Sequence, residues 1–150
     1  MLTRFEQFCS IISTIYRDVQ RLGREVMIQY GYKGAFAQYL VVLCQNPEGL
    51  SASQLSELCD KDKAAVSRVV AEMQEKGLIH RECGECSVYK SKIKLTEEGQ
   101  RIACSVCQSV HETVAAVAGE LTEEERDAFY RSLGLIHGKL DSLIKDGREQ

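Results

Sequence analysis

The sequence contains few of the residues that interrupt helices. Its 150 residues include one proline and no tryptophan. Proline in a helix interior removes a backbone donor and costs about 3 kcal/mol, so its near absence permits long helices. The length suits one domain whose core is large enough to fold without a partner. We therefore expect a mainly α body with one small β-hairpin.

Segments that would place the chain in or across a membrane are also missing. The sequence has no run of about 18 apolar residues and no secretory signal. We expect a soluble, cytoplasmic protein without a membrane partner.

Motifs that support catalysis are absent as well. The chain has no glycine-rich nucleotide-binding loop, no metalloprotease histidine pair and no recognisable Ser/His/Asp arrangement. Its histidines, His80, His111 and His137, fall in different expected elements. The sequence therefore predicts that the protein is not an enzyme.

A net charge of −3 argues against a nucleic-acid partner, but the charge is unevenly distributed. Residues 61–94 contain eight Lys/Arg and five Asp/Glu, a net charge of +3, which leaves −6 on the remainder. Positive charge concentrated on one segment is typical of a surface that meets DNA.

The segment from Leu50 to Ile79 predicts two helices joined by a short polar turn. Ser51 and Gln54 form a capping box at the start of the first helix. Asp60 stands at the turn, where it tolerates the left-handed conformation, and Asp62 caps the second helix. This arrangement is a helix-turn-helix.

The second helix has one apolar face and one short, small and basic face. Val66, Val69, Val70 and Met73 recur at helical spacing, and Gly77 follows at the expected end. The opposite face consists of Lys63, Ala64, Ala65, Ser67 and Arg68. Such a face fits the major groove, where its long residues reach phosphates or guanine edges. The alternative is an ordinary amphipathic helix with a solvated basic face. In the first helix we expect Ser51, Ser53 and Gln54 to touch phosphate.

A period-two pattern after Gly77 predicts a two-stranded wing. Tyr89, Ser91, Ile93 and Leu95 alternate with Val88, Lys90, Lys92 and Lys94. Residues 78–81 supply the partner strand and residues 83–86 the tip. A wing beside a recognition helix contacts the backbone or the minor groove, here through Arg81, Lys90 and Lys92.

In combination and order these motifs resemble the MarR (multiple antibiotic resistance regulator) family over nearly the whole chain. The matching segments are residues 62–68, residues 75–79, the wing and residues 95–99. The resemblance implies a homodimeric winged-helix repressor or activator that often responds to small phenolic ligands, oxidants or metals. The chain departs from the family in its wing. The usual Asp-x-Arg pair is missing, two cysteines occupy the tip, and Lys90 or Lys92 is the expected substitute for the arginine.

Both terminal helices contain apolar stripes that one core need not bury. We expect helices over residues 3–29 and about 97–118, and a last helix ending near Lys145. The stripes, at alternating spacings of three and four, are Phe5, Phe8, Ile12, Ile15, Val19, Leu22 and Val26, then Phe129, Leu133, Ile136, Leu140 and Leu143. We expect one domain over residues 1–150. Its winged helix-turn-helix, about 35–96, is flanked by dimerisation helices, about 3–29 and 97–146, and the dimer reads a palindromic operator.

Seven cysteines are a high, odd number, and the sequence leaves their role open. Cys44 and Cys59 lie on apolar faces and are expected in the core. Cys83, Cys86, Cys104 and Cys107 have a four-cysteine zinc spacing, although a wing strand would carry the first pair away from the second. Two smaller metal sites remain: His80 with Cys83 and Cys86, and Cys104 with Cys107 and His111. The main alternative is scattered thiols without a metal or other cofactor.

Thiol chemistry gives two further hypotheses. Cys9, near the start of the first helix, is placed as in the peroxide-sensing branch of the family, with Tyr30, Tyr32 and Tyr39 downstream and Phe36 where a tyrosine partner is expected. The Cys83/Cys86 pair is a second candidate sensor. The runner-up function is a thiol- or metal-based redox protein that uses Cys83 and Cys86.

Overall fold

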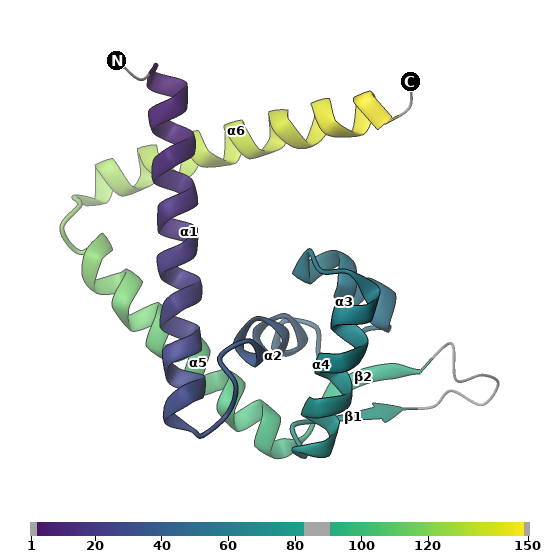
Figure 1. Ribbon diagram of the computed structural model, residues 1–150. Coiled ribbons are helices and arrows are strands. Elements are labelled where there is room, and N and C mark those ends of the chain that lie inside the picture. Colours follow the sequence, from purple (N-terminus) through teal and green to yellow (C-terminus); the bar gives the residue numbers. More distant parts are fainter. Residues whose placement is uncertain (1–2, 83–90, 149–150) are drawn as a thin grey trace. The chain divides into compact units, whose positions relative to one another are not determined.

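The computed structural model describes residues 3–82 and 91–148, which form six helices and two strands (Figure 1). Along the chain these are α1 (Arg4–Gln29), α2 (Phe36–Cys44), α3 (Ala52–Cys59), α4 (Lys63–Glu75), β1 (Ile79–Glu82), β2 (Lys92–Leu95), α5 (Glu97–Ala118) and α6 (Glu123–Arg148). The fold is mainly helical with one antiparallel hairpin, as expected. The chain divides into two compact units, Met1–His111 and Glu112–Gln150. The expectation of a single domain stays a prediction.

Helix α2 is the centre of the first unit. It lies between α1 and α3 and packs against both of them and against β2 (Figure 1). Its side chains are apolar almost all round, and Phe36 and Leu40 are completely buried. A helix without a polar face must be covered on every side, so the other elements assemble around it.

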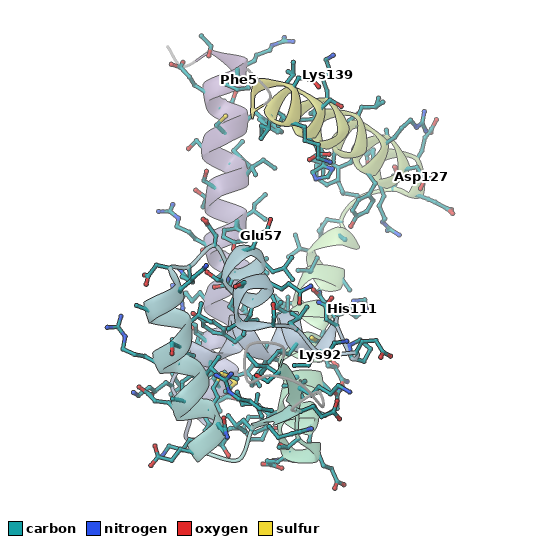
Figure 2. The ribbon with its side chains drawn as sticks, turned by 90° about the vertical axis from the view of Figure 1, so that its right-hand side faces the viewer. Phe5, Glu57, Lys92, His111, Asp127 and Lys139 are labelled. Atoms are coloured by element: carbon teal, nitrogen blue, oxygen red, sulfur yellow. The ribbon has the colours of Figure 1, made fainter. Side chains whose placement is uncertain are left out.

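Helix α1 joins this core only through its second half. Thr3 caps its start in a capping box with Glu6, whose carboxylate accepts a hydrogen bond from the Thr3 backbone and thereby has a lowered pKa. Val26 and Met27 are buried, whereas Phe5 is 69% exposed. Figure 2 shows Phe5 near the outer end of α1, well away from Glu57 of α3 and Lys92 of β2. The N-terminal half of α1 therefore presents apolar side chains that its own unit does not cover.

The two strands pair over four residues, from Ile79 opposite Leu95 to Glu82 opposite Lys92. Ile79 and Ile93 anchor the pair in the core. Leu50 adds a short third partner, since it exchanges two backbone hydrogen bonds of 3.1 and 2.8 Å with Ile93. The strand pair is thereby attached to the start of the helix-turn-helix.

Helix α5 begins against the loop that follows α4. Thr96 caps it by accepting a hydrogen bond from the backbone N–H of Gly99, and its hydroxyl donates to the carbonyl of Gly77. A Cβ at Gly99 would lie 1.9 Å from the carbonyl oxygen of Leu78. Only glycine allows this approach, which brings Ile102 and Val106 into the core.

The second unit contains the end of α5, a turn and α6. At the start of α6 the Glu125 carboxylate accepts hydrogen bonds from the backbone N–H and the hydroxyl of Thr122, and both lower its pKa. The backbone N–H of Glu125 donates back to the Thr122 hydroxyl. Among the residues that the structure describes, no helix combines the length and apolar character needed to cross a membrane.

Most element boundaries agree with the sequence-based expectations, and a few differ. Helix α6 continues past Lys145 and through Gly147 to Arg148, because this segment contains no proline and a single glycine costs only about 1 kcal/mol in a helix. The first wing strand starts at Ile79, because the backbone N–H of Leu78 still donates to the carbonyl of Met73 at the end of α4.

Candidate nucleic-acid interface

The start of α3 is fixed by its capping box. The backbone N–H of Gln54 donates to the Ser51 hydroxyl at 3.2 Å, and the backbone N–H of Ser51 donates to the Gln54 side-chain oxygen at 2.9 Å. This leaves the hydroxyl hydrogen of Ser51 and the amide hydrogens of Gln54 as donors for a phosphate. Ser53 is exposed beside them.

A left-handed residue makes the turn between α3 and α4. Asp60 has φ 51° and ψ 52°, and the backbone N–H of Lys61 returns to the carbonyl of Ser56. Asp62 then caps α4, accepting the backbone N–H of Ala65 at 2.9 Å. These local hydrogen bonds to helix-end backbone groups hold the turn tight.

Helix α4 is held by one face and leaves the other open. Val66, Val70 and Met73 are completely buried and pack α4 against the core. The opposite face, defined here as the α4 face, consists of Lys63, Ala64, Ala65, Ser67 and Arg68, and all are exposed except the partly buried Ala65. The structure therefore brings together the five residues that the sequence placed in the major groove.

The described part of the wing contains two exposed cations from the predicted set. Lys92 is exposed on β2. Arg81 is exposed on β1, where its guanidinium donates to the buried Ser91 hydroxyl at 3.3 Å. Lys90, the third predicted wing contact, lies outside the described residues.

Lys94, on the same strand as Lys92, is paired with a carboxylate. Its ammonium lies 2.8 Å from the Glu82 carboxylate across the strand pair. This hydrogen bond raises the pKa of Lys94 and lowers that of Glu82. Sequence alternation alone put Lys94 on the cationic face of the wing and did not reveal its partner.

The predicted metal sites are not supported by the part of the chain that the structure describes. Within residues 3–82 and 91–148, no three His, Cys, Asp or Glu side chains come together in a group that would hold a metal ion. This includes Cys104, Cys107 and His111, although they share one helix. Their spacing puts them on a common side of α5 without bringing three donors to one point. Cys83 and Cys86 lie outside the described residues.

The residues named for peroxide sensing through Cys9 lie in separate places. Cys9 is exposed in the N-terminal half of α1, while Phe36 and Tyr39 are buried in the core. The hydroxyl of Tyr30 donates to Ser105 at 3.0 Å, and the guanidinium of Arg101 covers its ring. The aromatic partners expected for Cys9 are therefore engaged elsewhere.

Comparisons with known proteins agree with this geometry. Residues 30–85 match the model of the MarR family. A Thauera aromatica protein assigned as a transcriptional regulatory protein for the hcr operon is 26% identical over 130 residues, covering 87% of this chain and 74% of that protein.

Two solved structures show the same fold. A MarR family protein from Bacillus stearothermophilus has a TM-score of 0.76 at 21% identity, covering 94% of this chain and 99% of that one. A MarR family regulator from Listeria monocytogenes, solved with a 26mer DNA, has a TM-score of 0.74 at 18% identity, with 93% and 90% covered.

Proposed function

We propose, from the premise that this chain belongs to the MarR family of transcriptional regulators, that it is a homodimer which reads a two-fold symmetric DNA operator. In this proposal the α4 face enters the major groove. Ser51, Ser53 and Gln54 hold phosphates at the start of α3, and Arg81, Lys90 and Lys92 contact the backbone or minor groove at the wing. Acting on the chromosome, such a regulator works in the cytoplasm.

The exposed α4 face is the observation that carries the proposal. Two alanines, Ala64 and Ala65, keep the first turn of the helix free of long side chains, so this end can approach the groove floor. Lys63 and Arg68 flank them along the chain and are exposed. Arginine pairs well with guanine edges, and lysine pairs with phosphate. The Listeria regulator of the same fold was solved with DNA, which supports a DNA partner for this chain.

The homodimer is supported by apolar side chains that remain exposed within each unit taken alone. On α1 these include Phe5, Ile12 and Ile15, and on α6 they include Ile136 and Leu140. Isolated apolar residues are common on surfaces, but contiguous stripes at helical spacing mark an interface. A second copy of the chain would cover them and fix two α4 faces about one DNA turn apart.

Regulation by an effector is proposed from the family resemblance. A small molecule, an oxidant or a metal would act by binding to, or reacting with, one of two dimer geometries more favourably than the other. Typical coupling between such sites is about 1–3 kcal/mol.

Selection from random-sequence DNA tests the operator directly. The purified reduced protein is incubated with a randomised duplex pool, and the bound fraction is sequenced. We expect a palindromic consensus whose half-sites lie about one turn, roughly 10 base pairs, apart. Enrichment of an asymmetric site would contradict the dimeric reader, and no enrichment at low salt would contradict DNA recognition.

The second candidate, a thiol redox protein that uses Cys83 and Cys86, predicts a different result. A dithiol in that role would reduce a disulfide substrate with turnover, and a Cys83→Ser variant would lose it. A regulator would show no turnover in the same assay.

A further inference from the structure

Three cysteines that the DNA-binding surface does not use meet between α2 and α5. The side-chain amide nitrogen of Gln100 lies 3.2 Å from the sulfur of Cys44 on α2 and 3.4 Å from the sulfur of Cys104 on α5. A hydrogen bond also joins the side chains of Cys107 and Cys44. Cys44 is therefore in reach of two thiols on another helix, and all three belong to the first unit.

The three thiols differ in access. Cys104 is exposed, whereas Cys44 and Cys107 are partly buried. Burial raises the pKa of the Cys107 thiol, and the sulfurs of Cys44 and Cys104 add to the effect. Because the thiolate is the reactive form and an oxidant must reach it, the exposed Cys104 is the entry point and the other two are resolving thiols.

We propose that Cys44, Cys104 and Cys107 form an oxidisable thiol site in which Cys44 of α2 becomes linked to α5 by a reversible disulfide. The oxidant class is a peroxide. The site is independent of the proposed DNA-binding function, because its product is a covalent bond that can be detected without DNA.

The chemistry balances with hydrogen peroxide as the only co-reactant. The Cys104 thiolate attacks one peroxide oxygen and the O–O bond breaks. The departing hydroxide takes a proton to become water, and Cys104 becomes a sulfenic acid. The Cys44 sulfur then attacks the Cys104 sulfur, forming the S–S bond and breaking the S–O bond. The proton of the Cys44 thiol leaves with that oxygen as a second water. Cys107 can then attack the Cys44 sulfur, which forms the Cys44–Cys107 bond and releases Cys104 as a thiol.

The link would join two parts of the winged-helix unit that are now held by non-covalent contacts. Helix α2 packs against α1, α3 and β2. A disulfide from Cys44, the last residue of α2, would therefore tie the core of the winged-helix unit to α5. A disulfide needs its two Cα atoms about 4.4–6.8 Å apart and a specific dihedral angle, and the hydrogen bonds through Gln100 and between Cys107 and Cys44 keep the three sulfurs close together before any reaction.

Peptide mapping tests the proposal on the full chain. Trypsin leaves Cys44 and Cys59 on one peptide, residues 34–61, and Cys104 and Cys107 on another, residues 102–126. After peroxide treatment, blocking of free thiols and digestion without reductant, we expect these two peptides joined, with the mass of two hydrogens lost. The joined species should run as a monomer on a non-reducing gel and should disappear with dithiothreitol.

Cys59 provides the matched control because it shares a peptide with Cys44. It is 1% exposed, and burial raises its pKa to about 11, so its thiol should not react. Cys44→Ser should abolish the joined peptides, and Cys59→Ser should leave them. Circular dichroism of each variant separates loss of the link from loss of the fold. A variant with Ser at Cys9, Cys83 and Cys86 should still form the link.

Two results would overturn the proposal. One is peroxide-treated wild type in which residues 34–61 and 102–126 are never joined while Cys9 or other thiols are oxidised. The other is a link that survives Cys44→Ser or that appears only between two chains.

Discussion

Lys92 and Lys94 lie two residues apart on β2, yet their surroundings give them different roles. Lys94 is paired with Glu82 at 2.8 Å, whereas Lys92 is exposed. The carboxylate of Glu82 partly compensates the charge of Lys94, and Lys94 would lose this contact if it turned to a phosphate. Lys92 is therefore the better candidate for a DNA contact, although the sequence pattern treats the two alike.

Replacing Lys92 with alanine should weaken binding to all DNA sequences by a similar factor. A phosphate contact contributes electrostatically and carries no sequence information, so its loss should lower the slope of log affinity against log salt by about 0.9. Fluorescence anisotropy over a salt series measures this. Lys139→Ala on α6 is the control for loss of one exposed lysine, and a Lys92→Ala variant with an unchanged slope would contradict the contact.

Replacing Arg68 with alanine should weaken operator binding by about 1–3 kcal/mol if the guanidinium reads a base. Arg68 is exposed on the α4 face, and no described ion pair includes it. Its loss should matter far less on random DNA, because a base contact forms only at the correct sequence. Titration of both duplexes with wild type, Arg68→Ala and Arg131→Ala measures the difference. Equal loss on both duplexes would make Arg68 a phosphate contact.

At the scale of elements, close backbone contacts determine how the helices dock. The start of α5 approaches the chain after α4 so closely that Gly99 leaves no room for a side chain. The chain must leave α4 at Gly77, which has φ +72°, for Leu78 to reach this position. These two glycines therefore allow the close connection between α4, the strand pair and α5.

Gly99→Ala should destabilise the protein by about 1–3 kcal/mol or more, because the added Cβ would overlap the carbonyl oxygen of Leu78 at 1.9 Å. Gly134→Ala is the matched control within a helix. No atom lies within 4 Å of a Cβ placed there, so the better helix propensity of alanine should stabilise α6 by up to about 1 kcal/mol. Urea denaturation of the two variants measures both effects, and similar changes in both would contradict the packing argument.

At the scale of the whole molecule, apolar side chains on α1 and α6 remain exposed because the described residues of each unit do not cover them. Ile136 and Leu140 on α6 are 39% and 48% exposed. A long helix with this much uncovered apolar surface gains most of its stability from packing against something else. The proposed partner is a second copy of the chain.

Replacing Ile136 and Leu140 together with glutamate should convert the protein to a monomer and remove tight operator binding, because a dimer engages two half-sites at once. Light scattering after gel filtration measures the mass, and anisotropy measures the affinity. Lys139→Glu introduces a carboxylate at an exposed position between them and should leave both unchanged. A double variant that stays dimeric would place the interface elsewhere.

Local signals determined the elements and their order. The capping box at Ser51, the N-cap at Asp62, the left-handed Asp60 and the helix end at Gly77 were all predicted from residue type, and all are confirmed. These features depend on hydrogen bonds between residues three or four apart, which a sequence displays directly. The winged-helix order and the exposed α4 face could be derived from the same patterns.

Contacts between distant residues needed the tertiary structure. The bridge from Leu50 to Ile93, the pairing of Lys94 with Glu82 and the meeting of Cys44 with Cys104 and Cys107 depend on how helices and strands dock. No local spacing encodes that docking, because it is decided by the summed fit of buried side chains over the whole core. For the same reason, the regular spacing of Cys104, Cys107 and His111 left a metal site open as an alternative, and the described residues bring no three donors together there. The spacing did not reveal the partner that Cys44 provides from α2.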